Sequence, residues 1–592
     1  MNLSRVCRFL GLIVLLFGVS MLAAAPWTIP LFGQCEQFDF RSFLAIVESM
    51  ACCGAVSGAL FYFGSKAKQP PREYADSSNS DVSDPSFNPD DMYEVAEYVN
   101  QQPASRPLLR KEAIIVVGLG WILAGILGAA PFYFSHTVRK AETVPVAGTQ
   151  RGENAAAESP ITKTEEIPMS PVDCLFESFS GVTGFGATVI NDLETSAYVP
   201  RAILFWRCEL HFLGGLGIMV LFVAILGGRS AGKSLMQTEM PYTPQESPYS
   251  RVQKTALALL SVYLGLNVIL TILFFIEGMS FYDALCHSFS TVATGGFSTY
   301  NSSIGKFGSV WIEITAAIFM AISSCNFTLL YFLFIGQGKK LFCNTEFRVF
   351  IAILLTAIVL VSASCWLSGD FDNTNAAGSI AAEGEPVSPL TSLYNSVRYG
   401  GFQVISIMSS TGYGTYDYDS WNDFSRGILF LLMFTGACVG STTCGLKIIR
   451  LVIIWKTLKL EIERMYRPNI VRVIHLQGQA VEATDELRRN VLSYFALYVM
   501  VFVVSILLLL AVEPSSTWIE NGMDRNHQMY DSITSAATAY NCVGPSFGIT
   551  GATLNFGVFH TPAKVIFIIL MLMGRLELLV LFAIFSPQFW RS

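Results

Sequence analysis

Asp173–Gly186 reads DCLFESFSGVTGFG, Asp283–Gly296 reads DALCHSFSTVATGG, and Asp531–Gly544 reads DSITSAATAYNCVG. In each of these stretches an aspartate stands thirteen positions before a glycine. A fourth stretch, Tyr399–Gly412 (YGGFQVISIMSSTG), has no aspartate at its start. A hydroxyl residue stands six positions before the glycine in all four stretches: Ser180, Ser290, Ser406 and Thr538. Such regular spacing indicates an internal repeat.

The first and third stretches can also be aligned on the strings TGFG (183–186) and TGYG (411–414). In that register Gly184, and not Gly186, would be the equivalent of Gly412. The aspartate and hydroxyl spacings select Gly186, in agreement with the second and fourth stretches, and we follow the spacing.

Each stretch is interpreted as a half-helix that enters the membrane from outside and stops midway, followed by an extended segment that returns. An aspartate at the start suits an N-cap, because its carboxylate accepts from the free N–H groups of the first turn. The negative end of the helix dipole then points to the bilayer centre, where it favours a cation. Four copies around one axis would form a ring of backbone carbonyls that replaces the hydration shell of an ion.

Glycine suits the returning segment because it adopts left-handed backbone angles without a Cβ penalty. Broken backbone of this kind survives at membrane depth only inside protein or beside a watery cavity. The alternative is that glycine and serine serve only to pack helices closely, as small residues do in membranes. Four stretches in equivalent positions favour the first interpretation.

The composition places the chain in a membrane. Of its 592 residues, 52% are hydrophobic and 14% are charged, whereas a soluble domain has about 25% charged residues. Apolar windows of about 20 residues, long enough to cross the hydrocarbon core, recur along the chain. The predicted apolar segments are residues 7–32, 43–63, 112–134, 200–227, 252–277, 309–335, 346–368, 423–455, 491–512 and 562–586.

These segments predict an all-α integral membrane protein, in which four consecutive span/pore-loop/span units surround a pseudo-fourfold pore. The expected divisions are two N-terminal transmembrane helices (1–65), a flexible cytoplasmic linker (66–111), and pore units 1 (112–227), 2 (228–335), 3 (336–470, with an interrupted second helix) and 4 (471–592). The outer segment 139–170 is also expected to be flexible. Basic loops alternate with loops poor in Lys and Arg, which predicts that both termini are cytoplasmic.

Other function classes find little support. The net charge of -7 gives no reason to expect nucleic-acid binding. The thirteen cysteines lack metal-like spacing and are interpreted as small apolar residues. No catalytic cluster or nucleophile motif is found, so the chain is not expected to be an enzyme, and His287 is interpreted as a packing or capping residue.

The arrangement of span, re-entrant loop and span, four times over, resembles the Trk/Ktr/HKT superfamily of potassium transporters, and within it the TrkH-type membrane subunit. The resemblance covers nearly all of the chain. It rests on FESFSGVTGFGATV (176–189), HSFSTVATGGFST (287–299), FQVISIMSSTGYGT (402–415), NCVGPSFG (541–548) and GRLELLVLFAIFSPQFWR (574–591).

The resemblance implies potassium uptake across the plasma (bacterial inner) membrane, with potassium preferred over sodium. It implies a homodimer, a cytosolic nucleotide-binding regulatory subunit of the RCK (TrkA) type, and potassium as the substrate with no cofactor in this chain. The implied ion-binding filter consists of Thr183, Gly184, Phe185, Gly186, Ala293, Thr294, Gly295, Gly296, Ser409, Ser410, Thr411, Gly412, Asn541, Cys542, Val543 and Gly544.

The segment 423–455 is interrupted by GACVGSTTCG (436–445), which is a poor helix interior and predicts an unwound stretch beneath the filter. In the family this stretch is a gating loop, and Thr443 and Cys444 stand where more glycine is expected. A kinked helix without gating motion is the alternative. The implied gate residues are Gly436, Gly440, Ser441, Thr442, Gly445 and Arg575.

Arg575 lies near the middle of the last predicted span, where a guanidinium usually marks a cavity or a partner. By resemblance it faces the pathway below the filter and adds a barrier to cations; an ion pair, for example with Glu577, is the alternative. Two further functions stay open: a sodium- or proton-coupled cation symporter, and a secondary transporter without a filter. The latter normally carries inverted repeats, which the four units lack.

Overall fold

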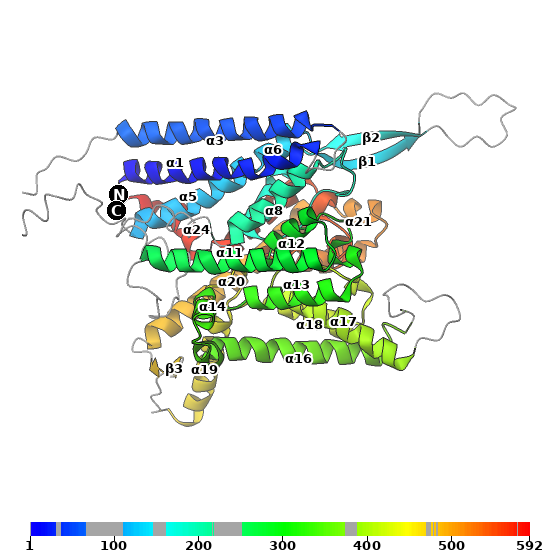
Figure 1. Cartoon of the computed structure of the whole chain (residues 1–592). Coiled ribbons are helices and arrows are strands. Elements are labelled where there is room, and N and C mark those ends of the chain that lie inside the picture. The colour runs from blue at the N-terminus through cyan, green and yellow to red at the C-terminus, as the bar shows by residue number, and fades with distance from the viewer. Residues whose placement is uncertain are drawn as a thin grey trace, which may run out of the picture.

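The computed structural model describes residues 2–30, 37–66, 110–145, 162–215, 217, 252–372, 374, 388–468, 475–476, 479–480, 484–576 and 578–591. Long helices that share one direction dominate the fold (Figure 1). Both chain ends lie at one end of this bundle, opposite the β1–β2 hairpin (Figure 1). The predicted linker (66–111) lies mostly outside the described residues.

Two helices at the N-terminus pack against each other beside the rest of the chain. They are α1 (Leu3–Ser20), which continues into the 3-10 helix η1 (Met21–Thr28), and α3 (Phe40–Lys66). Small residues let the two helices approach: Ser57 Oγ donates to the carbonyl of Gly11 at 2.7 Å. Gly18 faces the side chain of Cys53 so closely that a Cβ would overlap it.

Residues 110–215 form the first of four similar units. It comprises α5 (Arg110–Gly128), α6 (Ala130–Phe134), β1 (Val138–Pro145), β2 (Thr162–Pro168), the pore helix α7 (Pro171–Thr183) and α8 (Arg201–Gly215). The strands pair antiparallel from Val138 with Pro168 to Pro145 with Thr162. The prediction that 139–170 is a flexible outer segment was therefore wrong for both strands, because their backbone groups pair with each other.

The second unit contains α11 (Val252–Ile276), the pore helix α12 (Phe281–Val292), η2 (Ser303–Phe307), α13 (Val310–Ser323), α14 (Phe327–Phe334) and α15 (Lys339–Cys343). The predicted continuous span 309–335 is instead bent by 107° between α13 and α14. The polar run from Ser323 to Asn326 explains the break, because the Asn326 side chain caps the new helix by accepting from the N–H groups of Thr328 and Leu329.

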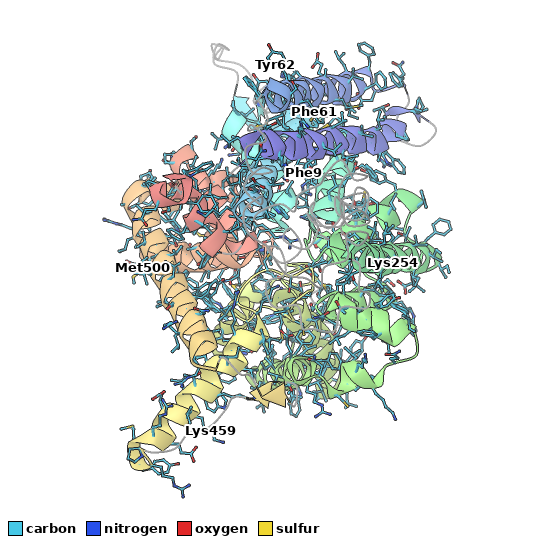
Figure 2. The ribbon with its side chains drawn as sticks, turned by 90° about the vertical axis from the view of Figure 1, so that its left-hand side faces the viewer. Phe9, Phe61, Tyr62, Lys254, Lys459 and Met500 are labelled. Carbon is cyan, nitrogen blue, oxygen red and sulfur yellow. The ribbon has the colours of Figure 1, made fainter. Side chains whose placement is uncertain are left out.

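The third unit contains α16 (Thr345–Ser368), the pore helix α17 (Pro389–Met408), η3 (Tyr418–Ser420), α18 (Asp423–Met433) and α19 (Ile448–Tyr466), followed by the short strands β3 (His475–Leu476) and β4 (Gln479–Ala480). The fourth unit contains α20 (Thr484–Val512), α21 (Ser516–Glu520), η4 (Arg525–His527), the pore helix α22 (Gln528–Asn541), η5 (Gly548–Thr550), η6 (Phe556–Val558), α23 (Thr561–Arg575), α24 (Leu578–Phe585) and α25 (Pro587–Arg591). Seen from the end that carries the termini, α19 with Lys459 extends beyond the helices that carry Lys254 and Met500 (Figure 2).

Within the described residues, six helices are long and apolar enough to cross a membrane, or seven if α13 and α14 count as one bent span. The other predicted spans are shorter or interrupted: 200–227 is described only as α8, 423–455 is broken between α18 and α19, and 562–586 is divided into α23 and α24. The predicted all-α membrane fold is confirmed.

The pore helices begin differently from the prediction. Ser170 is the N-cap of α7 and Ser280 is the N-cap of α12; each hydroxyl accepts from the N–H group of the aspartate three residues later. Asp173 and Asp283 therefore occupy the third helical position, as in a capping box, and the N-cap assignment of these aspartates was wrong. The carboxylate of Asp531 is likewise not an N-cap, since it accepts from Trp518 Nε1 and from the N–H group of Ile549.

Buried ion pairs join neighbouring units. Lys564 of α23 lies 2.6 Å from Asp173 of α7, and Arg398 of α17 makes two 2.6 Å hydrogen bonds to Glu313 of α13. The first pair joins the fourth unit to the first, and the second joins the second unit to the third. Removing one member of such a pair leaves an uncompensated buried charge, so the pairs make the relative placement of the units costly to change.

Candidate ion pathway

Four short segments follow the pore helices and share one backbone conformation. We call them the return segments: residues 183–186, 293–296, 409–412 and 541–544. The last residue of each is a glycine with φ between +77° and +101°. The residue two positions earlier also has a positive φ: Gly184 at +75°, Thr294 at +53°, Ser410 at +50° and Cys542 at +51°. Three non-glycine residues thus tolerate the left-handed region at equivalent positions.

One backbone hydrogen bond recurs in all four units and shows which of their residues are equivalent. The N–H group of the residue before the glycine donates to the carbonyl of the hydroxyl residue of the pore helix. The bonds are Phe185 to Ser180 at 2.9 Å, Gly295 to Ser290 at 2.8 Å, Thr411 to Ser406 at 3.0 Å and Val543 to Thr538 at 3.1 Å. Gly186 is therefore the structural equivalent of Gly412, as the spacing predicted.

The hydroxyl groups of the repeat hold the chain after the glycine. Ser180 Oγ donates to the carbonyl of Ala187 at 2.6 Å, and Ser406 Oγ donates to the carbonyl of Tyr413 at 2.7 Å. In the fourth unit Thr538 Oγ1 lies 3.2 Å from the carbonyl of Pro545. Ser290 differs, since its hydroxyl pairs with Nδ1 of His211. The sequence identified these hydroxyls as part of the repeat but not what they bind.

The four glycines stand in a closed ring. A Cβ built on each glycine would point at the carbonyl oxygen of the residue before the glycine in the next unit. The nearest atoms are Gly295 O for Gly186, Thr411 O for Gly296 and Val543 O for Gly412, all closer than 3.0 Å, and Phe185 O for Gly544 at 3.1 Å. The sequence of contacts runs from unit 1 through units 2, 3 and 4 and returns to unit 1. A side chain at any of the first three positions would collide with a backbone carbonyl.

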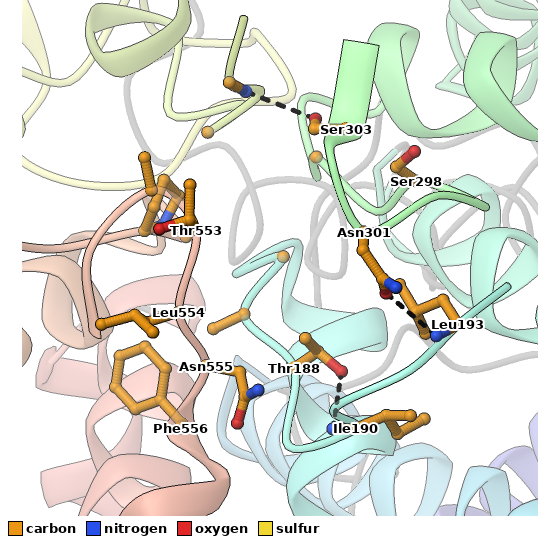
Figure 3. Close-up of a pocket in the computed structure, with 18 of the residues that line it drawn as sticks. Thr188, Ile190, Leu193, Ser298, Asn301, Ser303, Thr553, Leu554, Asn555 and Phe556 are labelled. Carbon is orange, nitrogen blue, oxygen red and sulfur yellow. Dashed lines mark hydrogen bonds between the residues drawn. The ribbon is translucent and has the colours of Figure 1, made fainter. Parts of the chain in front are cut away.

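A cavity of about 110 Å³ lies on the side of the ring that is formed by the segments after the glycines, and all four glycines line it. Its wall is formed by the segments that follow the glycines, including Thr188, Ser298, Thr553 and Asn555 (Figure 3). Because all four glycines reach this cavity, the return segments converge on one axis. We call the cavity the outer vestibule.

Hydrogen bonds join the four units around the outer vestibule, one junction after another. At each junction one unit donates to its neighbour. The bonds are Leu193 N to Asn301 Oδ1 at 3.0 Å (Figure 3), Gly305 N to Gly414 O at 3.2 Å, Gly548 N to Asp419 Oδ2 at 3.1 Å, and Phe556 N to Thr188 O at 2.9 Å; at the third junction the fourth unit donates to the third. This second closed set of contacts supports the geometry of the glycine ring.

A buried guanidinium lies behind the first return segment. Arg207 of α8 contacts Glu177 of α7 at 2.5 Å, donates to the carbonyl of Ser298 at 2.9 Å, and lies 3.5 Å from the ring centroid of Phe297. Glu177 in turn accepts from the N–H group of Val189 at 3.1 Å. Sequence analysis missed this pair; the acidic and basic residues in otherwise apolar segments were the available indication.

His287 occupies in α12 the position that Glu177 occupies in α7, nine residues before the glycine. Its Nε2 pairs with Ser298 Oγ at 2.9 Å, and its Nδ1 pairs with the carbonyl of Asp283 at 2.8 Å. Both ring nitrogens of His287 bind groups of its own unit, one in the pore helix and one after the return segment, as expected of a packing or capping residue.

Asp419 lies in the loop between the third return segment and α18. Burial, reinforced by the nearby carboxylate of Asp417, raises the pKa of Asp419 to about 7. Its Oδ2 accepts from the N–H group of Gly548, and its Oδ1 is buried without a hydrogen-bond partner among the described residues. Asp419 thus links protonation to the turn that follows the fourth return segment.

Residues 434–447 form a non-helical loop directly beneath the ring, and we call it the central loop. It separates α18 from α19, so the predicted unwinding of 436–445 is confirmed and a continuous kinked helix is excluded. Its ends are held by a hydrogen bond from the N–H group of Gly436 to the carbonyl of Leu446 at 2.9 Å. Gly440 and Gly445 have φ values of +73° and +79°, which explains glycine at these positions.

The central loop contacts all four return segments or the residue that precedes them. Thr442 Oγ1 lies 3.2 Å from Thr294 Oγ1 and donates to the carbonyl of Val292 at 3.1 Å. The remaining contacts are Cys444 Sγ to Thr183 O at 3.5 Å, Cys444 N to Ser410 Oγ at 3.4 Å, and Gly445 with Asn541, whose Oδ1 is 3.0 Å from a Cβ built on the glycine. The loop therefore covers the inner side of the ring.

Arg575 ends α23 and joins the central loop to the first unit. Its Nη1 donates to the carbonyl of Thr442 at 2.7 Å, and its Nη2 donates to the carbonyls of Gly214 and Gly215. The guanidinium also lies 5.2 Å from the ring centroid of Trp121. Glu577, the alternative partner, lies outside the described residues. No group of three metal-binding side chains occurs in the part of the chain that is described.

A comparison with known protein families identifies this architecture. The family model described as "TrkH: Cation transport protein" matches residues 130–592, and the relatives agree. The chain belongs to the TrkH family. The TrkH family transports cations and is not a family of enzymes.

Individual members of the TrkH family are similar to this chain over most of its length. "Trk system potassium uptake protein TrkH" of Salmonella typhimurium is 34% identical over 488 residues, which are 82% of this chain and 87% of that protein. "Trk system potassium uptake protein TrkG" of Escherichia coli is 32% identical over 491 residues, 82% of this chain and 86% of that protein. The crystal structure of the potassium transporter TrkH from Vibrio parahaemolyticus matches with a TM-score of 0.69 and 29% identity, covering 100% of both chains.

Proposed function

We propose that the chain takes up potassium across the plasma (bacterial inner) membrane through a filter formed by the four return segments. The observation that carries the proposal is the closed ring in which each glycine faces the carbonyl of the next unit. A ring of backbone carbonyls can replace the hydration shell of a dehydrated cation. The relatives named as potassium uptake proteins support potassium as the substrate.

In this proposal the return segments bind the ion through their carbonyls. Gly186, Gly296, Gly412 and Gly544 allow the four segments to approach one axis, because a Cβ would meet the neighbouring backbone. The pore helices direct the negative ends of their dipoles at the ring and favour a cation there. The outer vestibule receives the ion from outside, and its wall is polar at Thr188, Ser298 and Asn555.

The central loop is proposed as the gate. It lies across the inner side of the ring and contacts each unit there, so an ion leaving the ring meets the loop. Gly436, Gly440, Ser441, Thr442 and Gly445 supply its conformational freedom, and Arg575 ties it to α23 and α8 while placing a positive charge below the ring. Movement of the loop away from Thr294 and Thr183 would open the path.

The orientation proposed for the chain places both termini in the cytoplasm. The two ends lie at one end of the bundle, and the basic residues Lys254 and Lys459 lie on that face (Figure 2). The divisions 1–65, 66–111, 112–227, 228–335, 336–470 and 471–592 are retained as a proposed description of two N-terminal helices, a linker and four pore units. A homodimer and a cytosolic RCK-type regulatory subunit are proposed from the family resemblance.

The test is uptake of potassium, rubidium and sodium by proteoliposomes that contain the purified chain, with and without an imposed proton gradient. The proposal predicts potassium and rubidium uptake that exceeds sodium uptake. Uptake that requires the proton gradient would favour the symporter, and equal uptake of all three ions would contradict the proposed filter. Empty liposomes provide the control.

A further inference from the structure

The first half of the central loop, before Ser441, is bound by the break between α13 and α14. The N–H group of Cys438 donates to the carbonyl of Ser324 at 3.1 Å, and the N–H group of Phe327 donates to the carbonyl of Gly440 at 3.0 Å. α14 and α19, which lie close to these contacts in the chain, are placed toward the end of the bundle that carries the chain termini (Figure 1). The second unit therefore holds this part of the loop through backbone groups alone.

One carboxylate binds the same part of the central loop. Glu346 lies in the first turn of α16, and its Oε1 accepts from the N–H group of Val439 at 2.9 Å. The glutamate is buried, with an exposed fraction of 5%. Val439 stands between Cys438 and Gly440, so this side-chain bond falls between the two backbone bonds. The proposed filter and gate give Glu346 no role.

The bond between Glu346 and Val439 is of the stronger kind. A hydrogen bond from an N–H group to a carboxylate is charge-assisted and about twice as strong as one between neutral groups. A buried carboxylate that loses its donor carries a further cost, because the charge is then neither hydrated nor hydrogen-bonded. Movement of the central loop away from α16 breaks this bond, so the bond favours the position of the loop beneath the ring.

We propose that Glu346 is a positioning residue of the gate: its carboxylate holds the central loop across the inner side of the ring and so keeps the pathway closed. This inference rests on the proposed role of the loop as the gate. An interaction that is made in only one of two conformations shifts the equilibrium toward that conformation. Glu346 acts through the backbone of Val439 and not on the return segments, so it sets how often the path opens and not which ion is preferred.

The chain offers a matched control in its first unit. Glu112 lies in the first turn of α5, is buried with an exposed fraction of 2%, and accepts from the N–H group of Asn2 at 2.6 Å. It thus resembles Glu346 in burial, in its place at the start of a helix and in its backbone donor. Asn2 is not part of the central loop. A general effect of neutralising a buried carboxylate is therefore expected equally from Glu112→Gln and Glu346→Gln.

The first test measures the position of the loop without transport. Cys438, 2% exposed in the central loop, is alkylated with N-ethylmaleimide in the purified full chain, and Cys286 of α12, 0% exposed, reports general loosening. Glu346→Gln keeps the shape of the side chain but makes the bond neutral, so alkylation of Cys438 should become about fivefold faster. Alkylation of Cys286 should not change, and Glu112→Gln should leave both rates unchanged.

Three results would overturn the proposal: an unchanged rate at Cys438 in Glu346→Gln, an equal rise at Cys286, or an equal rise at Cys438 in Glu112→Gln. If Glu346→Gln does not fold, Glu346→Asp takes its place. Aspartate keeps the charge but is one methylene shorter, so it moves the carboxylate away from Val439 and should also speed the alkylation of Cys438.

The second test is uptake of potassium and sodium by proteoliposomes that contain the same variants. Glu346→Gln should raise potassium uptake by up to about fivefold and leave the potassium-to-sodium ratio unchanged, because the carbonyls of the ring are not touched. A changed ratio would overturn the assignment, since Glu346 would then act on the ring. Faster alkylation of Cys438 without faster uptake would contradict the central loop as the gate, so failure of the proposed gate and failure of the contact with Glu346 give different results.

Discussion

Gly186 and Gly184 offer a sharp test of the ring, because they lie in one return segment and differ in what a side chain would meet. Both have positive φ values, +79° and +75°, so alanine at either position costs about 1–2 kcal/mol of backbone strain. A Cβ at Gly184 would have its nearest neighbour, Ala293 O, at 3.9 Å, which is ordinary contact. A Cβ at Gly186 would stand 1.9 Å from Gly295 O.

The required displacement follows from these distances. Cβ atoms essentially never approach closer than 3.0 Å, so the Gly295 carbonyl must move by at least 1.1 Å, the difference between 3.0 and 1.9 Å. That carbonyl belongs to the ring, and a shift of this size removes it from the position matched to the ion. We expect Gly186→Ala to lower the potassium-to-sodium uptake ratio at least tenfold, or about 1.4 kcal/mol.

The assay is uptake of both ions by proteoliposomes, with thermal unfolding in detergent as the measure of folding. Gly184→Ala should change the ratio less than about twofold, because Thr294, Ser410 and Cys542 already occupy the equivalent left-handed position. Equal loss of selectivity in both variants would show that backbone strain causes the effect. Unchanged selectivity in Gly186→Ala would refute the role of the ring.

Three further predictions concern charged groups. Arg575→Ala should raise potassium influx while Arg575→Lys should not, because the barrier is electrostatic; influx that is lower or unaltered in the alanine variant would show that the bonds of Arg575 to the central loop matter more. Lys564→Met should lower the free energy of unfolding by about 3–5 kcal/mol, since it leaves Asp173 charged and buried, and the added substitution Asp173→Asn should restore much of the loss; thermal unfolding decides. The pKa of Asp419 is raised to about 7 in the folded chain, so its carboxyl group stays protonated to a higher pH in the folded chain than in the unfolded chain. The stability that this protonation contributes is present at low pH and is lost as the pH rises through 7. Asp419→Asn should therefore stabilise the protein more at about pH 8 than at about pH 5, and a pH-independent difference in Tm would contradict the assignment.

The repeat itself could be predicted from the sequence because it depends on local geometry. The spacing from the hydroxyl residue to the glycine is fixed by one backbone hydrogen bond, from Phe185 to Ser180 in the first unit and from Thr411 to Ser406 in the third. The spacing therefore selected Gly186 correctly over Gly184. The break beneath the ring was predictable for a similar reason, since Gly440 and Gly445 adopt angles that helices exclude.

Features that depend on distant residues could not be read from the sequence. The span 309–335 appeared continuous because its apolar composition hides the cap formed by Asn326. The hairpin of β1 and β2 was missed because its pairing joins residues that are separated by a polar segment. The aspartates of the repeat were assigned as N-caps, but the serine three positions earlier caps the helix, and Asp173 instead meets Lys564 from the last unit. Such partners are defined only by the fold.

The central claim is that four glycines bring carbonyls of the return segments to one axis, where they bind a dehydrated potassium ion. Rubidium, which replaces potassium and scatters anomalously, tests it most directly in a crystal of the protein. The account predicts an anomalous peak on the axis between Gly186, Gly296, Gly412 and Gly544, and loss of that peak in Gly186→Ala. An anomalous peak elsewhere in the protein, with none between the four glycines, would contradict the claim.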